Sequence, residues 1–107
     1  MKRKLNVIID RPLGHEHPEW PGFIYRVNYG YVPGIMAPDG EEQDVFVLGV
    51  DTPLQQFEGD LIAIIHRRDD VEDKWVVAPT GVTFTLQEIE QAVAFSEQYF
   101  DSYIEMV

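Results

Sequence analysis

This chain has no cysteine, few basic residues and no long apolar run in its 107 residues. Without cysteine it can form no disulfide, no thiolate metal site and no thiol nucleophile. No window approaches the length of a membrane span. The basic start, residues 1–10, lacks the apolar stretch and the small-residue cleavage site of a signal peptide. We therefore expect a cytoplasmic protein that does not associate with membranes.

The shortage of basic residues leaves a strongly negative chain. Only 8 lysines and arginines stand against 19 aspartates and glutamates, which gives a formal net charge of −11. Such a field repels nucleic acid and anionic lipid, so we expect no nucleic-acid partner. A small phosphate-bearing substrate is not excluded, because divalent cations can reverse the sign of the local field.

The apolar content is sufficient for one packed core. Hydrophobic residues make up 45% of the chain and aromatic residues 12%, which argues against disorder. The length suits one domain, residues 1–107. A domain of this size buries a modest share of its surface, so a homo-oligomer would gain stability.

The first three quarters of the chain read as short strands. In the second of them, Tyr25, Val27, Tyr29 and Tyr31 would share one face, and residues 14–22 form a loop. The predicted strands are residues 6–10, 23–32, 45–50, 60–66 and 75–77.

The C-terminal third has the period of a helix. Thr85 and Glu88 have the spacing of a capping box. Apolar residues then recur from Leu86 to Ile104 and predict one amphipathic helix of about 20 residues. Short strands and one terminal helix predict a mainly β fold with α (α+β), in which a small β-barrel carries a C-terminal helix.

Carboxylates concentrate in two segments, residues 39–44 and residues 69–73, each at the end of a predicted strand. Hard cations such as Mg²⁺ prefer carboxylate and water oxygens, so the two segments are candidates for a metal site. Acid-rich loops can also be merely solvated. The first segment lacks the ligand spacing of an EF-hand.

Four ordered motifs resemble the soluble inorganic pyrophosphatases of the OB-fold type. They are Asn28-Tyr29-Gly30-Tyr31, Asp39-Gly40-Glu41-Glu42-Gln43-Asp44-Val45, Glu72-Asp73-Lys74-Trp75-Val76-Val77 and Phe95-Ser96-Glu97-Gln98-Tyr99. The similarity extends over residues 6–103. It implies a five-stranded OB-like barrel that hydrolyses pyrophosphate with Mg²⁺, or with Mn²⁺ in its place.

The resemblance also implies roles for individual residues. Glu41 would accept a proton from the attacking water, Lys74 would bind phosphate, and Tyr29 and Tyr99 would contact phosphate or shape the pocket. The implied metal carboxylates are Asp39, Asp44, one of Asp69 and Asp70, one of Glu72 and Asp73, and Asp10 in the outer shell.

The chain departs from the family pattern in its cations. A lysine expected after Tyr99 is Phe100, and the segment that supplies further cations has shrunk to residues 14–18. Glu41 stands where the family has an aspartate, which would move the base by about 1 Å. Arg67 and Arg68 are the best candidate replacements, ahead of the other possible substitutes, Arg11, Arg26, His15 and His17.

These departures leave three functions open. The chain could be a pyrophosphatase with relocated cations, a hydrolase of a nucleoside polyphosphate, or a metal-binding domain without turnover. An oligonucleotide-binding OB module is disfavoured by the negative charge, whereas a protein-interaction domain stays an alternative.

The remaining polar and aromatic candidates have two interpretations each. His15 and His17 could bind a transition metal with Asp10, but a solvated loop explains them as well. We expect Trp20 and Trp75 to be packing residues, and Tyr25 to lie in the core or at the rim of a strand face.

Overall fold

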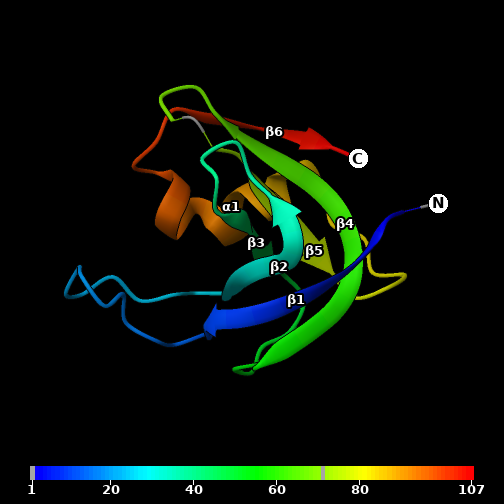
Figure 1. Cartoon of the computed structure of the whole chain (residues 1–107), viewed down its shortest axis with the longest axis horizontal. Helices are drawn as coiled ribbons and strands as arrows, with labels where there is room; N and C mark the ends of the chain where they lie inside the picture. The colour runs from blue at the N-terminus through cyan, green and yellow to red at the C-terminus, as the bar shows by residue number, and fades with distance from the viewer. Residues whose placement is uncertain (1, 71) are drawn as a thin grey trace.

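The computed structural model describes residues 2–70 and 72–107. Figure 1 shows a curved β-structure with one helix packed against it. The elements in chain order are β1 (Lys4–Arg11), β2 (Asn28–Met36), β3 (Glu42–Val47), β4 (Gln56–Arg67), β5 (Lys74–Ala78), α1 (Leu86–Glu97) and β6 (Ser102–Met106).

Five strands close into a barrel. The strand order is β1-β2-β3-β5-β4, and an additional antiparallel pairing of β1 with β4 joins the two ends. Only β3 and β5 run parallel. β6 adds to β4 outside the closed barrel. The predicted fold class, a small five-stranded barrel with a C-terminal helix, is confirmed.

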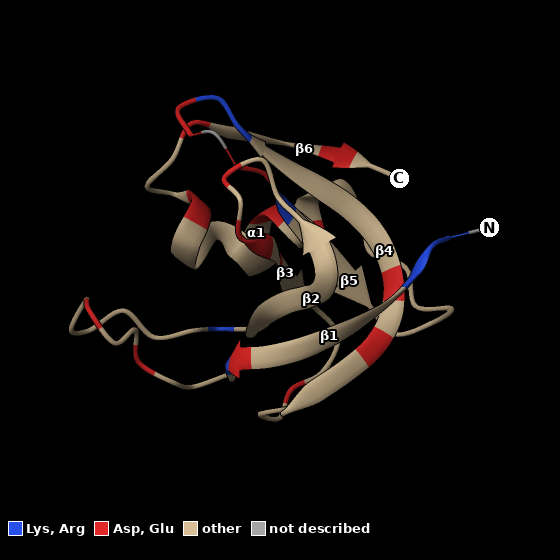
Figure 2. Cartoon of the chain, viewed as in Figure 1, with Lys and Arg blue, Asp and Glu red and all other residues tan. Residues whose placement is uncertain are grey.

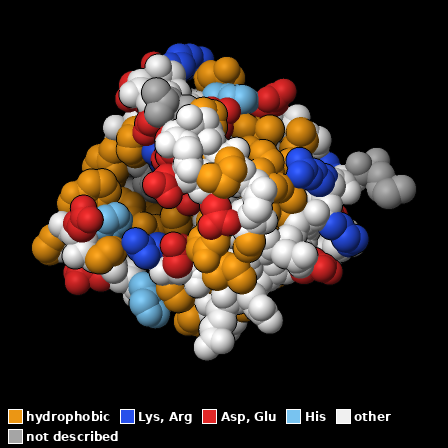
Figure 3. Space-filling view, viewed as in Figure 1, with side chains coloured by type: hydrophobic (Ala, Val, Ile, Leu, Met, Phe, Trp, Pro, Cys, Tyr) orange, Lys and Arg blue, Asp and Glu red, His pale blue; other side chains and the backbone are white. Residues whose placement is uncertain are grey.

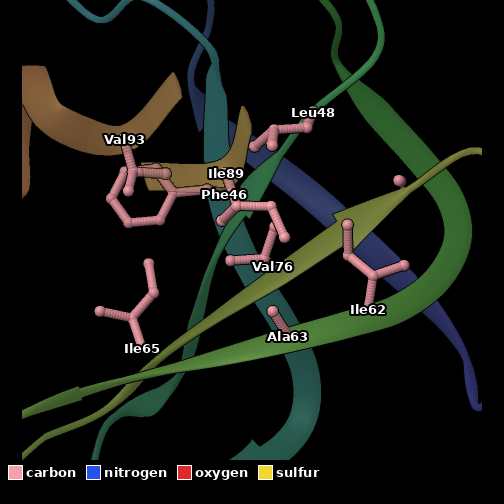
Figure 4. Close-up of a cluster of buried hydrophobic side chains, with 9 residues drawn as sticks. Phe46, Leu48, Ile62, Ala63, Ile65, Val76, Ile89 and Val93 are labelled. Atoms are coloured by element: carbon pink, nitrogen blue, oxygen red, sulfur yellow. The ribbon is translucent and has the colours of Figure 1, made fainter. Parts of the chain in front are cut away.

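The central strands β3 and β5 are buried on both faces, which is why they read as nearly continuous apolar runs. Val45 and Val47 point into the barrel, where they pack with Leu5, Val7 and Val77. Phe46 and Val76 point the other way and pack under α1 against Ile89 and Val93 (Figure 4).

The helix begins as predicted and ends earlier. Thr85 caps it, and Thr85 and Glu88 make both hydrogen bonds of the capping box. The prediction of about 20 helical residues is wrong, because α1 has 12 and stops at Glu97. The residues that follow, up to Ile104, include Asp, Ser and aromatic side chains that favour helix weakly. The chain turns at residues 98–101 and then forms β6, because the edge of β4 offers backbone partners from Ala63 to Arg67.

The second predicted strand begins five residues later than expected, at Asn28. The side chain of Asn28 is fully buried and accepts hydrogen bonds from the backbone N–H groups of Leu13 and Leu54. It also donates to the carbonyl of Thr52. Residues 23–27 instead fold back on the preceding loop, where Tyr25 N–H donates to the carbonyl of His15 and Gly14 N–H donates to the carbonyl of Tyr25.

The four other predicted strands differ from prediction only in their bounds. β1, β4 and β5 are longer than predicted, and β3 lies three residues earlier. Tyr25 is buried as expected, and Trp75 packs beside the barrel core. Trp20 packs outside the core, where its ring stacks on His17, and it remains 58% exposed. In residues 2–70 and 72–107, no helix is long and apolar enough to cross a membrane.

Gly30 is required by the close approach of β1 and β2. A Cβ atom built on Gly30 would lie 1.9 Å from the carbonyl oxygen of Ile8, which is backbone and cannot turn away. We predict that Gly30→Ala lowers the free energy of unfolding by about 1–3 kcal/mol, measured by urea denaturation. An unchanged denaturation midpoint would show that β1 and β2 separate more easily than the structure implies.

His66 ties β4 to β6 and to the start of β5. One ring nitrogen lies 2.8 Å from Glu105 Oε1 and the other 3.2 Å from Asp73 Oδ2, and the ring stacks on Tyr103. The hydrogen bond to Glu105, with the charge of Asp73, raises the pKa of His66.

A raised pKa in the folded state means that the charged histidine stabilises the fold below its unfolded pKa of about 6.5. This stabilisation is lost as pH rises through the folded value. We predict that wild type melts above a His66→Asn variant near pH 5.5 and that the difference narrows by about pH 8.5. A gap in melting temperature that is constant over this range would contradict the role of the charge.

Candidate functional site

The polar site begins where the apolar core under α1 ends. Side chains two residues apart on a strand share a face. Asp44 therefore lies on the face of Phe46, Lys74 on the face of Val76, and Arg67 on the face of Ile65. The register holds these strands together, since Phe46 pairs with Val76, and Ile65 pairs with Lys74. On each of these strands, the face that packs under α1 thus changes from an apolar residue to a charged one at the same end of the sheet.

Lys74 is at the centre of the site. Its ammonium group donates to Asp44 Oδ2 at 2.8 Å, to the Tyr29 hydroxyl at 2.9 Å, and to Glu72 Oε1. The lysine side chain is 6% exposed, against 33% for Asp44 and 18% for Glu72. The carboxylates therefore form the outer layer, and the structure joins the two acidic segments through one buried cation.

The carboxylates crowd one another. Burial and a hydrogen bond to Asp39 raise the pKa of Glu72, while the same hydrogen bond lowers the pKa of Asp39. Burial also raises the pKa of Asp10, and the charge of Asp44 adds to this although Arg11 opposes it. Burial and the charge of Asp44 keep the pKa of Tyr29 well above 10. Tyr29 is therefore a protonated hydrogen-bond donor at neutral pH.

Gln43 fastens the two acidic segments to each other. Its buried side-chain amide donates to the carbonyl of Asp44 at 3.0 Å and to the carbonyl of Asp73 at 2.8 Å. Figure 2 shows acidic residues of the β2–β3 turn and of the β4–β5 loop at the same end of the molecule. Gln43 was not among the predicted site residues. Its position within the acidic motif was the only sequence signal for it.

Arg67 is the second buried cation of the site. Its guanidinium makes two hydrogen bonds to Glu97 of α1, at 2.6 and 3.1 Å, and its third nitrogen lies 3.6 Å from Asp70 and 4.0 Å from Glu72. Burial alone would lower the pKa of Arg67, but Glu97 outweighs it and the net shift is upward. Of the two best candidate replacements, Arg67 therefore faces the second acidic segment. Arg68 points elsewhere, to Asp101 and Tyr103.

The predicted metal residues separate into two groups. Asp44 and Glu72 contact Lys74, and Asp39 is hydrogen-bonded to Glu72. Asp10 lies close enough to Asp44 for the charge of Asp44 to raise the pKa of Asp10. Asp70 is nearby, where it accepts from the Glu72 N–H and faces Arg67. Asp69 instead accepts a hydrogen bond from the N–H of Asp101. Asp73, the alternative to Glu72, faces His66.

Two predicted catalytic residues lie on the rim. Glu41 is exposed on the same turn as Asp39, whose carboxylate accepts the Glu41 N–H. Tyr99 is 67% exposed, and its ring lies 6.4 Å from that of Phe23. The histidines of the first loop are not assembled with Asp10. His17 stacks on Trp20, and its ring accepts the N–H of Glu19.

The described residues, 2–70 and 72–107, contain no set of three or more histidine and acidic side chains already arranged to hold a metal ion. The chemistry of the donors nevertheless fits a hard divalent cation. Asp39, Asp44, Glu72 and Asp10 supply oxygen only, and their crowding is the environment that a cation relieves.

Comparison with known proteins supports the motif resemblance. The chain is 31% identical to an inorganic pyrophosphatase of Saccharolobus solfataricus, over 70% of this chain and 54% of that protein. It therefore spans about half the length of this curated relative. No family model matches the chain.

Solved structures show the same fold. An inorganic pyrophosphatase from Ehrlichia chaffeensis superposes with a TM-score of 0.77 at 17% identity, over 97% of this chain and 86% of that one. One from Neisseria gonorrhoeae gives 0.67 at 24% identity, over 90% and 73%.

Removing the buried lysine tests how the site is held together. We predict that Lys74→Met lowers the free energy of unfolding by about 3–5 kcal/mol, because Asp44 and Glu72 lose their shared partner. A Lys74→Met, Glu72→Gln double variant should recover part of this loss. Lys4→Met removes a lysine that pairs with Asp60 at the surface and serves as the control, with a change below about 1 kcal/mol. Equal losses in the Lys74 and Lys4 variants would contradict the central position of Lys74.

Proposed function

We propose that this chain, which is similar to inorganic pyrophosphatases, hydrolyses inorganic pyrophosphate to two phosphates with a divalent cation. One observation carries the proposal: Asp44 and Glu72, from segments far apart in the sequence, meet on the ammonium group of Lys74. Carboxylates beside a buried lysine suit a metal-bound phosphate substrate, because the carboxylates can bind the metal and the lysine can bind the phosphate.

Mg²⁺ is the cation we propose, with Mn²⁺ as the alternative of the same ligand preference. Asp39, Asp44 and Glu72 would hold it, with Asp10 and Asp70 at the edge. When bound, it supplies polarisation of water and neutralisation of phosphate charge. A chain of net charge −11 needs such neutralisation to admit a polyanion.

The protein's own residues position the phosphates and the proton. Lys74 would bind a phosphate oxygen, and Arg67, fixed by Glu97, adds a second positive charge beside Glu72. Tyr29 keeps its proton and would donate a hydrogen bond. Glu41, exposed on the turn beside Asp39, would accept the proton of the attacking water.

Arg67 compensates in part for the cation that Phe100 fails to supply. The aromatic ring of Phe100 covers the guanidinium at 3.7 Å, and the carboxylate of Glu97 accepts two hydrogen bonds from it. This arrangement favours the pyrophosphatase with relocated cations among the functions considered. We propose that it acts in the cytoplasm, a location with which a chain without cysteine is compatible.

Asp44 is the residue whose loss tests the proposal most directly. We predict that Asp44→Asn lowers metal-dependent phosphate release from pyrophosphate by at least about 100-fold, because a proposed metal ligand that contacts Lys74 loses its charge. The assay is release of inorganic phosphate with Mg²⁺ and, separately, with Mn²⁺. Circular dichroism should show an intact fold.

Asp51→Asn is the matched control, since it removes the same charge from an exposed loop after β3. It should retain the wild-type rate. Full activity of the Asp44 variant would refute the assignment of this residue, and no phosphate release by wild type with either metal would refute the proposed function.

A further inference from the structure

An aromatic cavity of about 490 Å³ lies next to the site. Its walls are uncharged and come from the first loop and from the segment after α1: Trp20, Pro21, Gly22, Phe23, Tyr99 and Phe100. The volume is within the range of about 300–1,000 Å³ typical of small-molecule sites. Figure 3 shows a hollow with hydrophobic walls on the left of the molecule, with acidic side chains gathered on its inner side.

The walls of the cavity are held in place. The N–H of His17 donates to the carbonyl of Phe23, and that of Phe23 to the carbonyl of Trp20, so the loop is tied across its base. The Trp20 ring stacks on His17 with centroids 4.3 Å apart, and the Phe23 ring lies 5.8 Å from that of Phe95 on α1. The aromatic surface is therefore built into the fold.

The same aromatic surface is open to solvent. Trp20 is 58% exposed and Tyr99 is 67% exposed. Two large rings on the walls of one cavity expose contiguous apolar area, which in soluble proteins marks a binding surface more often than scattered single residues do.

Phe100 joins the cavity to the candidate active site. It lines the cavity, and its ring covers the guanidinium of Arg67 at 3.7 Å. Arg67 in turn lies 4.0 Å from the carboxylate of Glu72. A second connection runs from Phe23 through the rings of Tyr25 and Tyr29, 5.4 Å apart at each step, to the ammonium group of Lys74.

We propose that this cavity binds the nucleobase of a nucleoside diphosphate or triphosphate whose phosphates lie at the Lys74 site. The inference rests on the proposed function, because it places phosphate at the carboxylates. Any nucleobase is a planar, uncharged ring and can stack on aromatic side chains, whichever base it is. A ligand with a ring and a phosphate chain is the chemical class that uses both adjoining surfaces at once.

The experiment compares two ligands that carry the same diphosphate ester, ADP and methyl diphosphate. Binding to the intact protein is measured by isothermal titration calorimetry with Mg²⁺, so the readout does not depend on turnover. Stacking of the base should make ADP bind roughly ten-fold more tightly than methyl diphosphate.

Trp20→Leu and, independently, Phe23→Leu should reduce ADP affinity to that of methyl diphosphate and leave methyl diphosphate binding unchanged. Trp75→Phe, which removes the other tryptophan away from the cavity, is the control and should keep the ten-fold preference. Two separate variants guard against a folding defect in either one, and circular dichroism verifies each fold.

Equal affinities of wild type for ADP and methyl diphosphate would overturn the inference. So would sedimentation showing self-association that Trp20→Leu abolishes, because a second copy of the chain would then cover the cavity. A different result would refute the proposed function alone: no hydrolysis of pyrophosphate, with the preference for ADP over methyl diphosphate still present. Hydrolysis without that preference would refute the nucleobase site alone.

Discussion

The structure depends on a lysine buried among acids. Lys74 is almost inaccessible, yet its ammonium group satisfies a carboxylate from β3, a carboxylate from the loop before β5, and a tyrosine hydroxyl from β2. Burying one charge is costly unless its partners are fixed, and here the barrel fixes them through strand register. The buried ammonium group of Lys74 therefore requires partners from three segments that are far apart in the chain, and these segments meet around it.

Some of the excess acidic residues of the sequence are clustered around Lys74. Most acidic side chains of the chain are exposed, but Asp44 and Glu72 share the ammonium group of Lys74, and Asp39 is hydrogen-bonded to Glu72. Acidic groups held this close favour the arrival of a further positive charge. The crowding of these carboxylates is therefore a consequence of how the barrel packs, and not of net charge alone.

A second buried ion pair links the helix to the same site. Arg67 on β4 and Glu97 at the end of α1 are both nearly inaccessible and make two hydrogen bonds. Because α1 ends at this contact, the chain can turn and place Phe100 over the guanidinium before it returns as β6. The position of the helix end thus fixes one wall of the aromatic cavity.

Local patterns in the sequence were sufficient for much of this. Alternation and apolar runs predicted the strands of the barrel, the Thr85 and Glu88 pair predicted the start of α1, and four ordered motifs indicated the fold family. They succeeded because each depends on neighbours in the chain. The end of α1 and the start of β2 were mispredicted because both depend on distant partners: the free edge of β4 and the hydrogen bonds of Asn28.

The sequence alone determined which residue types were available: oxygen ligands in two segments, one motif lysine, and too few cations for a polyanion without metal. Only the tertiary structure decided that Asp44 and Glu72 meet on Lys74, that Asp69 turns away to Asp101, and that Arg67 rather than Arg68 faces the site. The chemistry of a side chain can be read from the sequence at one position. The convergence of these side chains depends on the register of the strands and on the residue at which the helix ends. Both follow from packing between segments far apart in the chain.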